Sequence, residues 1–167
     1  MGQAAQKMSK GDHKELIDIL NVAYAEEWLA YYQYWIGAKL AHGPRRESIT
    51  AEFEKHAGEE LKHAGWIADR IIQLGGTPII DPNEFSKVAK CKYLPPRDSF
   101  ILKLVEQNLD GERCAISRYQ QICEMTAGKD YVTFNLSRKI MKEEEEHEQD
   151  MEDYHLDITS ASDFYKK

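Results

Sequence analysis

Glycine and proline residues, which interrupt helices, break this chain at three places. Among its 10 glycines and 5 prolines, the breaks fall near residues 43–44, between 75 and 96, and at 128. The first and last breaks are short, whereas roughly twenty residues connect the second stretch to the third. That order of connections is typical of two antiparallel helical hairpins joined by a long crossover. We therefore predict an all-α four-helix bundle, with helices over residues 12–41, 46–74, 98–126 and 130–156.

The crossover and the two ends complete the predicted organisation. Pro82 to Lys90 has helical composition and is compatible with a short extra helix in the crossover. Asp98 and Ser99 follow two prolines and are the predicted N-cap of the third long helix. We expect one bundle domain over 12–157, a flexible tail over 1–11 and a short C-terminal tail over 158–167.

Every predicted helix has apolar residues at alternating spacings of three and four, the pattern of a helix that faces a bundle core. Ionisable residues interrupt each apolar row about midway. Carboxylates that face one core lose hydration and repel each other, at a cost on the order of several kcal/mol per ion, so they need cations or protons. The residues that interrupt the rows are Glu27, His56, Glu60, His63, Glu112, Glu144 and His147.

Six of these residues match the ligand set of a di-metal site. In four-helix di-metal proteins, two helices supply one Glu each and the other two supply a Glu-x-x-His pair, because residues three apart share a helix face. The predicted ligands are the pairs Glu60 with His63 and Glu144 with His147, and the single residues Glu27 and Glu112.

The spacing of these residues predicts that they lie at one height in the bundle. Two residues of an antiparallel hairpin are level when its turn lies at their midpoint. The midpoint of 27 and 60 is 43.5, at the first break, and the midpoint of 112 and 144 is 128, at the last. Each ligand is then ~24 Å from its turn at 1.5 Å per residue. The separations within the hairpins, 33 and 32 residues, also indicate an internal duplication.

Other acidic residues offer alternatives at some positions. Glu26 lies beside Glu27 but off the apolar row, and Glu106 breaks both the row and the mirrored spacing that Glu112 keeps. The run from Glu143 to Glu146, taken alone, is typical of a solvated charged face. The six-residue set is therefore preferred for its combination of residue type, spacing and turn position.

Two further residues are expected next to the ligands. His56 lies one turn before Glu60 on the same face and is expected to support the ligands rather than to bind metal. Tyr34 lies two turns after Glu27, where its hydroxyl either binds a ligand carboxylate or bound oxygen species, carries an electron, or simply packs in the core.

Charge and cysteine content exclude several classes of function. The net charge of −7 disfavours nucleic-acid binding, and Lys7, Lys10 and Lys14 form only a weak basic tail. No segment approaches the ~20 apolar residues of a membrane span, and no signal peptide is recognisable, so we expect a cytoplasmic protein without membrane contact. Three cysteines argue against a secreted disulfide framework but leave room for one redox pair.

Nearly the whole chain resembles the bacterioferritin branch of the ferritin superfamily, through the six predicted ligands and Tyr34. Within that branch, the segments around Cys91, Cys114 and 122–130 resemble the Dps-like thioferritins. These proteins combine a bacterioferritin-type di-iron site with nearby cysteines in a twelve-subunit shell. The resemblance implies a ferritin-like bundle in which Cys91 and Cys114 are the redox pair. Cys123 is separated from Cys114 by ~13 Å of helix, too far for easy pairing.

The chain departs from bacterioferritin at two positions. Leu61 stands where bacterioferritin has its haem-binding Met, so haem at that position is not expected. Asn108 precedes Leu109 where bacterioferritin has its ligand Glu, and the ligand has moved to Glu112, as it has in the Dps-like group.

The resemblance implies a ferroxidase that binds two iron ions per subunit, with manganese as an alternative metal. It would oxidise Fe(II), preferably with hydrogen peroxide rather than oxygen, store ferric iron in a homo-oligomeric dodecameric cage, and protect against oxidative stress. One alternative is a rubrerythrin-like peroxidase or manganese catalase without storage, although rubredoxin-type Cys-x-x-Cys pairs are missing. A second is a structural DNA-protecting protein of the Dps type, which the acidic charge disfavours.

Overall fold

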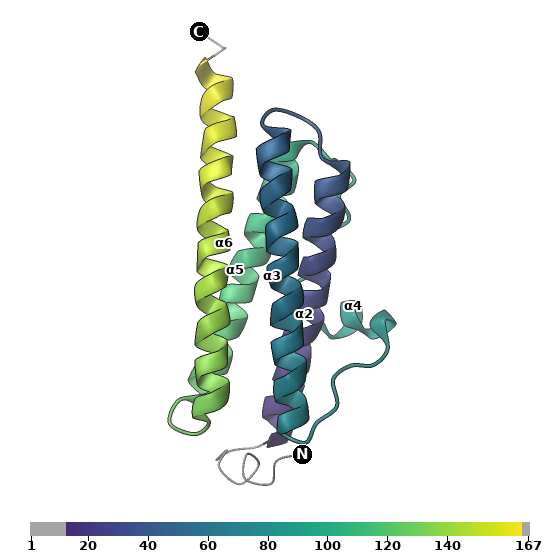
Figure 1. Ribbon diagram of the computed structural model, residues 1–167, viewed down its shortest axis with the longest axis vertical. Coiled ribbons are helices and arrows are strands. Elements are labelled where there is room, and N and C mark those ends of the chain that lie inside the picture. Colours follow the sequence, from purple (N-terminus) through teal and green to yellow (C-terminus); the bar gives the residue numbers. More distant parts are fainter. Residues whose placement is uncertain (1–12, 165–167) are drawn as a thin grey trace.

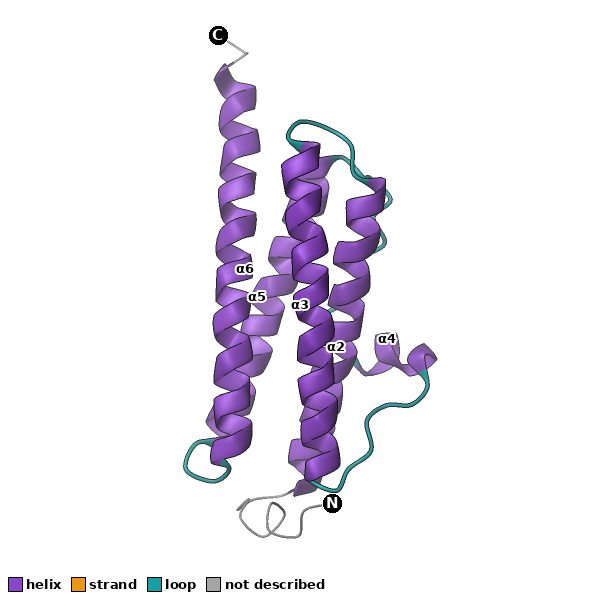
Figure 2. Cartoon of the chain, viewed as in Figure 1, coloured by secondary structure: helices purple, strands orange, loops and turns teal. Residues whose placement is uncertain are grey.

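The computed structural model describes residues 13–164, and these form the predicted all-α bundle (Figures 1 and 2). Two hairpins, α2 with α3 and α5 with α6, pack against each other through α2 with α5 and α3 with α6. The tail predicted over 1–11 lies outside the described residues. The helices are α2 (His13–Leu40), α3 (Arg46–Gln73), η1 (Pro82–Glu84), α4 (Phe85–Val88), α5 (Ile101–Thr126) and α6 (Tyr131–Phe164).

The two tight turns lie at the predicted midpoints of their hairpins. Gly43 has φ 125° and Gly128 has φ 71°, and residues with a Cβ rarely adopt such positive backbone φ angles. At Gly43 a Cβ would also lie 2.9 Å from Cε2 of Phe100, so the close approach of α5 requires glycine there.

The crossover contains the short helical segment that its composition indicated, formed by η1 and α4. The Asp81 carboxylate caps η1 by accepting the backbone N–H of Asn83. Phe85 at the start of α4 stacks on Trp28 and meets Tyr24 edge-on, which attaches the crossover to the outer face of α2.

Two ends of the long helices differ from the prediction by more than one residue. The third long helix, α5, begins at Ile101 instead of 98, and its N-cap is Phe100, so the predicted cap at Asp98 and Ser99 is wrong. Backbone hydrogen bonds between His42 and the 99–101 segment keep that segment extended. The Asp98 side chain instead accepts the N–H of Phe100 and closes a turn before the helix.

The last helix, α6, continues to Phe164, past its predicted end at 156 and into the stretch expected to be a tail. No glycine or proline follows Gly128, and Ile158 is buried in the core, so nothing stops the helix at 156. Figure 1 shows α6 projecting beyond the other helices at its C-terminal end. Within residues 13–164, none of the helices has the length and apolar character needed to cross a membrane.

The apolar core is divided into two clusters by a charged layer at mid-height. The cluster nearer the α2–α3 turn includes Tyr34, Ile49, Phe53, Val105 and Met151. The cluster at the opposite end includes Leu20, Ile67, Ile71, Ile122 and Ile140. Burial of such side chains stabilises the bundle by roughly 1.5–3 kcal/mol each, and holds the helices rigidly on both sides of the layer.

Candidate metal centre

The structure brings the six predicted ligands together in the charged layer, and all six are buried. They come from the four long helices, one from each of α2 and α5 and two from each of α3 and α6. Because the helices are held by the apolar clusters above and below, the side chains converge without any loop. The predicted common height is therefore observed.

Three carboxylates surround His63 on one side of the centre. Its Nδ1 lies 3.4 Å from Oε2 of Glu27, 3.5 Å from Oε2 of Glu60 and 3.0 Å from Oε1 of Glu144. A cation placed between these atoms would meet one imidazole nitrogen and three carboxylate oxygens.

His147 has the equivalent environment on the other side. Its Nδ1 lies 3.2 Å from Oε1 of Glu60, 3.3 Å from Oε2 of Glu144 and 3.8 Å from Oε2 of Glu112. Glu60 and Glu144 thus turn one oxygen toward each histidine. This arrangement suits two carboxylates that bridge two cations.

The donor set passes a test for metal binding. Glu27, Glu60, His63 and Glu144 form one group of potential ligand atoms within 4.8 Å of one another, and Glu60, Glu112, Glu144 and His147 form a second. Carboxylate and imidazole donors without thiolate suit iron or manganese. Several of these atoms are buried without a hydrogen-bond partner among the described residues, which is costly unless something else binds them. They are Glu27 Oε2, Glu60 Oε1, both Glu144 oxygens, His63 Nδ1 and His147 Nδ1.

Electrostatics in the centre show how the charges are balanced by protons. Burial raises the pKa of Glu27 to about 8 and that of Glu144 to about 7, and neighbouring carboxylates add to both shifts. Burial would lower the pKa of His63 and of His147, but contacts with the surrounding glutamates raise both well above the usual value. Protons on these four residues therefore balance the carboxylate charges of the metal-free centre, and a metal ion must displace protons when it binds.

Two buried tyrosines hold the single glutamates in a crossed arrangement. The Tyr34 hydroxyl donates to Oε1 of Glu112, and the Tyr119 hydroxyl donates to Oε1 of Glu27. Tyr34 was a predicted neighbour of the ligands, with its role left open, whereas Tyr119 was missed. A sequence signal existed, because each tyrosine lies seven residues after a single glutamate, Tyr34 after Glu27 and Tyr119 after Glu112.

The outer nitrogens of the two histidines are also held across the bundle. Nε2 of His63 lies 2.9 Å from Glu143, and Nε2 of His147 lies 3.0 Å from Glu59. Such carboxylate partners orient a histidine and direct its other nitrogen to a metal. Sequence reasoning missed both glutamates, although Glu-Glu-x-x-His occurs in both α3 and α6.

The other candidates lie where the apolar rows placed them. His56 is buried beside the centre, and its ring stacks on that of His147 with centroids 4.0 Å apart. Burial and the charge of His147 lower the pKa of His56 to about 3, so its imidazole is neutral. Glu106 is half-buried and pairs with Lys103, away from the centre. Of the acidic run, Glu143 is half-buried, whereas Glu145 and Glu146 are exposed.

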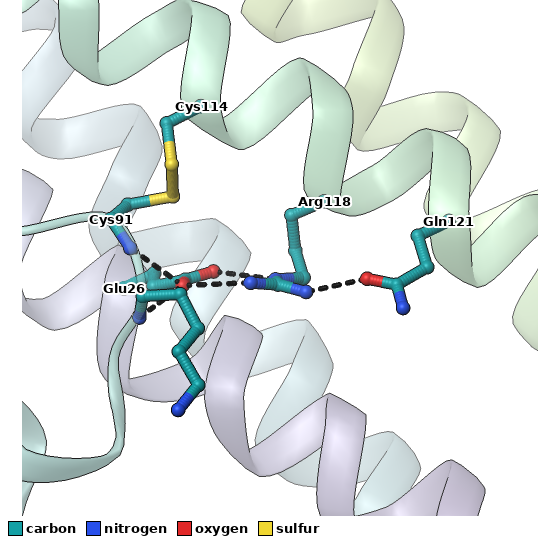
Figure 3. Close-up of a disulfide and its surroundings, with 6 residues drawn as sticks. Glu26, Cys91, Cys114, Arg118 and Gln121 are labelled. Carbon is teal, nitrogen blue, oxygen red and sulfur yellow. Dashed lines mark hydrogen bonds and ion pairs between the residues drawn. A yellow bond between two sulfur atoms is a disulfide. The ribbon is translucent and has the colours of Figure 1, made fainter.

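Cys91 and Cys114 form a disulfide between the crossover and α5, with Cα atoms 5.7 Å apart (Figure 3). Glu26, the rejected ligand alternative, is buried beneath it. Its carboxylate accepts the backbone N–H groups of Lys90 and Cys91 and pairs with Arg118. Cys123 is a buried free thiol.

A cavity of about 40 Å³ lies between α2, α5 and the crossover. That volume has room for a molecule the size of water or peroxide. It extends from the disulfide to the metal centre, and its lining includes Cys91, Tyr93, Glu27, Glu60, Glu112 and Tyr119.

Comparisons with known proteins agree with this geometry. The family model described as a ferritin-like domain matches residues 17–160. A DNA protection during starvation protein of Pyrococcus furiosus is 38% identical over 141 residues, which cover 82% of this chain and 75% of that protein. A bacterioferritin of Rhodobacter capsulatus is 28% identical over 139 residues, 83% of this chain and 80% of that protein. The dodecameric thioferritin of Bacteroides fragilis, a bacterioferritin-related protein, is 48% identical, with a TM-score of 0.97 over 99% of this chain and 100% of that one. The chain therefore belongs to the ferritin-like family.

Proposed function

We propose that this chain oxidises Fe(II) at two adjacent positions of the metal centre and stores the ferric product in a homo-oligomeric cage. The observation that carries the proposal is the pair of buried ligand groups that share Glu60 and Glu144. One position would use Glu27 and His63, and the other Glu112 and His147, with the two shared glutamates between them.

Charge balance supports two divalent ions rather than one. Four ionised glutamates carry −4 and two Fe(II) ions carry +4, so the filled layer is neutral with both histidines deprotonated and neutral. Neutrality makes burial of the charges tolerable. The same donors suit manganese, so iron is the proposed metal and manganese the competitor.

The proposed reaction couples two one-electron oxidations to one two-electron reduction. Each Fe(II) gives one electron, and hydrogen peroxide takes both electrons and two protons to form two water molecules. The cavity beside the disulfide supplies space for the oxidant next to Glu27 and Glu112. Hydrogen bonds from Tyr119 and Tyr34 keep these two carboxylates oriented while protons and ions exchange.

The cage is proposed from similarity. A dodecameric thioferritin aligns with 99% of this chain. We extend its assembly to this chain and propose a twelve-chain shell, in which oxidised iron collects as a ferric mineral. Peroxide consumed in this way would not generate radicals in the cell.

The test is an anaerobic Fe(II) titration of the metal-free protein, followed by matched additions of peroxide or oxygen, with particle mass recorded throughout. We expect about two Fe(II) per chain to be oxidised rapidly, faster with peroxide, and hundreds more ions to be retained per particle. The variant Glu144→Gln should lose rapid oxidation. Glu145→Gln, one position along α6 and less buried, is the matched control and should retain it.

Other results would favour a different function. Two metals bound and peroxide consumed without iron retention would identify a peroxidase or a manganese catalase. Absence of metal binding would remove the proposal altogether.

The DNA-protecting alternative has one observation in its favour, the name of the Pyrococcus furiosus relative. The net charge of −7 argues against a phosphate-binding surface on this chain. A gel shift of duplex DNA at physiological salt would reinstate that alternative.

A further inference from the structure

A second set of potential ligands lies next to the metal centre, between α3 and α6. Nε2 of His56 is 3.3 Å from Oε1 of Glu52 and 3.3 Å from Oδ2 of Asp150. The ligand atoms of the three residues lie within 4.8 Å of one another. Glu52 lies one turn before His56 on α3, and Asp150 lies one turn after His147 on α6, so two rigid helices position the group.

His56 connects this group to the metal centre. Its side chain is 0% exposed, and its Nδ1 has no hydrogen-bond partner among the described residues. The ring stacks on His147, and one of its nitrogens lies within 4.8 Å of ligand atoms of Glu112 and His147. One imidazole thus lies between two carboxylates on its outer side and the centre on its inner side.

The outer side is open to solvent, unlike the centre. The side chain of Glu52 is 23% exposed and that of Asp150 is 42% exposed, whereas the six central ligands are buried. Glu59 and Glu143, which hold the two central histidines, also belong to α3 and α6 and are partly exposed. This seam between α3 and α6 is therefore acidic, and it faces away from the cavity between α2 and α5.

A cation is already attracted to the outer carboxylates. Nζ of Lys55 lies 2.5 Å from Oε1 of Glu52. The lysine side chain is 56% exposed, and exposed ion pairs of this kind contribute little, so Lys55 can release Glu52 to a metal ion at low cost. Among the ion pairs of the described residues, Asp150 contacts no lysine or arginine, and it faces only the neutral imidazole of His56.

We propose that Glu52, His56 and Asp150 bind one divalent cation and that Fe(II) passes through this site between the α3–α6 surface and the metal centre. Two carboxylates and one imidazole, with the remaining positions filled by water, suit a divalent ion that must be bound and released quickly. The binding site stands on geometry alone, whereas the passage of Fe(II) rests on the proposed function.

The test uses Co(II), which binds the same donors as Fe(II) but is not oxidised by air as Fe(II) is. Metal-free protein is titrated and its visible absorbance followed, and cobalt is located by anomalous diffraction. We expect about three Co(II) per chain, with one anomalous peak between Glu52, His56 and Asp150. The double variant Glu52→Gln with Asp150→Asn should bind about two and lose that peak.

The matched control changes the same residue types on the same helices, Glu54→Gln with Asp153→Asn, and should bind as many Co(II) ions as the unchanged chain. Both control residues are exposed and lie outside the group. A chain that binds only two Co(II), or a double variant that still binds three, would overturn the proposed site.

Failure of the proposed function gives a different pattern. If the unchanged chain binds a single Co(II) and the Glu52→Gln, Asp150→Asn variant binds none, the result would support the new site and contradict the di-metal centre. The passage of Fe(II) has its own readout, because repeated rounds of Fe(II) oxidation should slow several-fold in the double variant and not in the control. An unchanged rate together with loss of the third Co(II) would overturn the passage.

Discussion

Tyr34 and Tyr119 occupy equivalent positions in the two hairpins, and each hydroxyl reaches the single glutamate of the other hairpin. A phenol that donates to one carboxylate oxygen leaves the other oxygen free for a metal and fixes its direction. The pKa of both phenols is raised well above the usual value by burial and by the nearby glutamates, so each hydroxyl remains a donor.

The Tyr119→Phe variant should therefore weaken metal binding at the Glu27 position. We expect roughly a 10-fold loss in affinity for one of the two ions, the lower end of the effect of removing a carboxylate-orienting group. Competition titration with a chelator measures the loss. Tyr131→Phe, at an exposed position, is the control, and equal affinities in both variants would mean that Tyr119 only packs.

Metal affinity should increase with pH. In the metal-free centre Glu27 has a pKa of about 8 and Glu144 a pKa of about 7, so both hold protons that a metal ion must displace. Below these pKa values each displaced proton weakens apparent binding by up to about tenfold per pH unit. Mn(II) titrations at pH 6 and pH 8 should differ by at least about tenfold, with protons released on binding. A pH-independent affinity would contradict this balance.

At the scale of elements, the start of α6 depends on one buried carboxylate. Asp130 accepts the backbone N–H groups of Val132 and Thr133 as an N-cap, and Arg70 from α3 pairs with it at 2.7 Å. This pair joins the two hairpins below the metal centre. Burial acts to raise the pKa of Asp130, but the Thr133 hydrogen bonds and Arg70 outweigh it and hold the pKa below its usual value.

Asp130→Ala should lower the free energy of unfolding by about 3–5 kcal/mol, because it removes the cap and leaves Arg70 buried without its counter-ion. Because the pKa is lowered in the folded chain, the stability from Asp130 is present above the unfolded pKa of about 3.8 and is lost as pH falls through the lower folded value. Denaturant unfolding at several pH values measures both effects. Asp153→Ala, exposed on α6, should change stability by less than about 0.5 kcal/mol.

The crossover is attached to the bundle by the disulfide and by Glu26. The variant Cys114→Ser opens a covalent loop whose two cysteines are 23 residues apart in the sequence, for which the chain-entropy model gives a loss of stability of about 3 kcal/mol. We expect faster hydrogen exchange at the amides of Lys90 and Cys91, which donate to Glu26. Reduction of the unchanged chain should have the same effect.

The disulfide is also the proposed redox pair. Cysteine-to-serine variants of Cys91 and Cys114 should alter iron oxidation or iron release, since the cavity that reaches the centre is lined by Cys91. Cys123, which forms no disulfide, is the comparison: Cys123→Ala should leave both rates unchanged. Unchanged rates in all three variants would remove the redox role.

At the scale of the whole molecule, the charged layer interrupts the apolar core at mid-height. Metal that binds only the folded chain should stabilise all four helices together, by about 2.7 kcal/mol for each site at a free concentration 100 times its Kd. Thermal unfolding with and without a chelator measures this effect. In Glu144→Gln, which retains only the proposed site at Glu52, His56 and Asp150, the chelator should change the melting temperature much less. An undiminished difference would place the stabilising metal outside the centre.

Much of the fold was predictable because it depends on local properties of the chain. Gly43 and Gly128 end helices through their own backbone freedom, and apolar residues at spacings of three and four define the buried faces. Together with the equal spacing of the ligands from the turns, these features predicted the bundle and the convergence of six residues. Their role in binding metal remains a prediction.

The sequence by itself thus determined four helices, two tight turns and a charged layer at one height, because helical geometry translates residue spacing directly into position. Only the tertiary structure decided which partners meet: Tyr119 with Glu27, His63 with Glu143, and Glu26 with the crossover. Each of these side chains has several neighbours at similar distances, and the rotation of its helix and its own rotamer decide which neighbour it contacts. These rotations and rotamers depend on the packing of all four helices at once. The same reason placed Phe100, rather than Asp98, at the start of α5, since contact with the distant His42 outweighed the local capping preference.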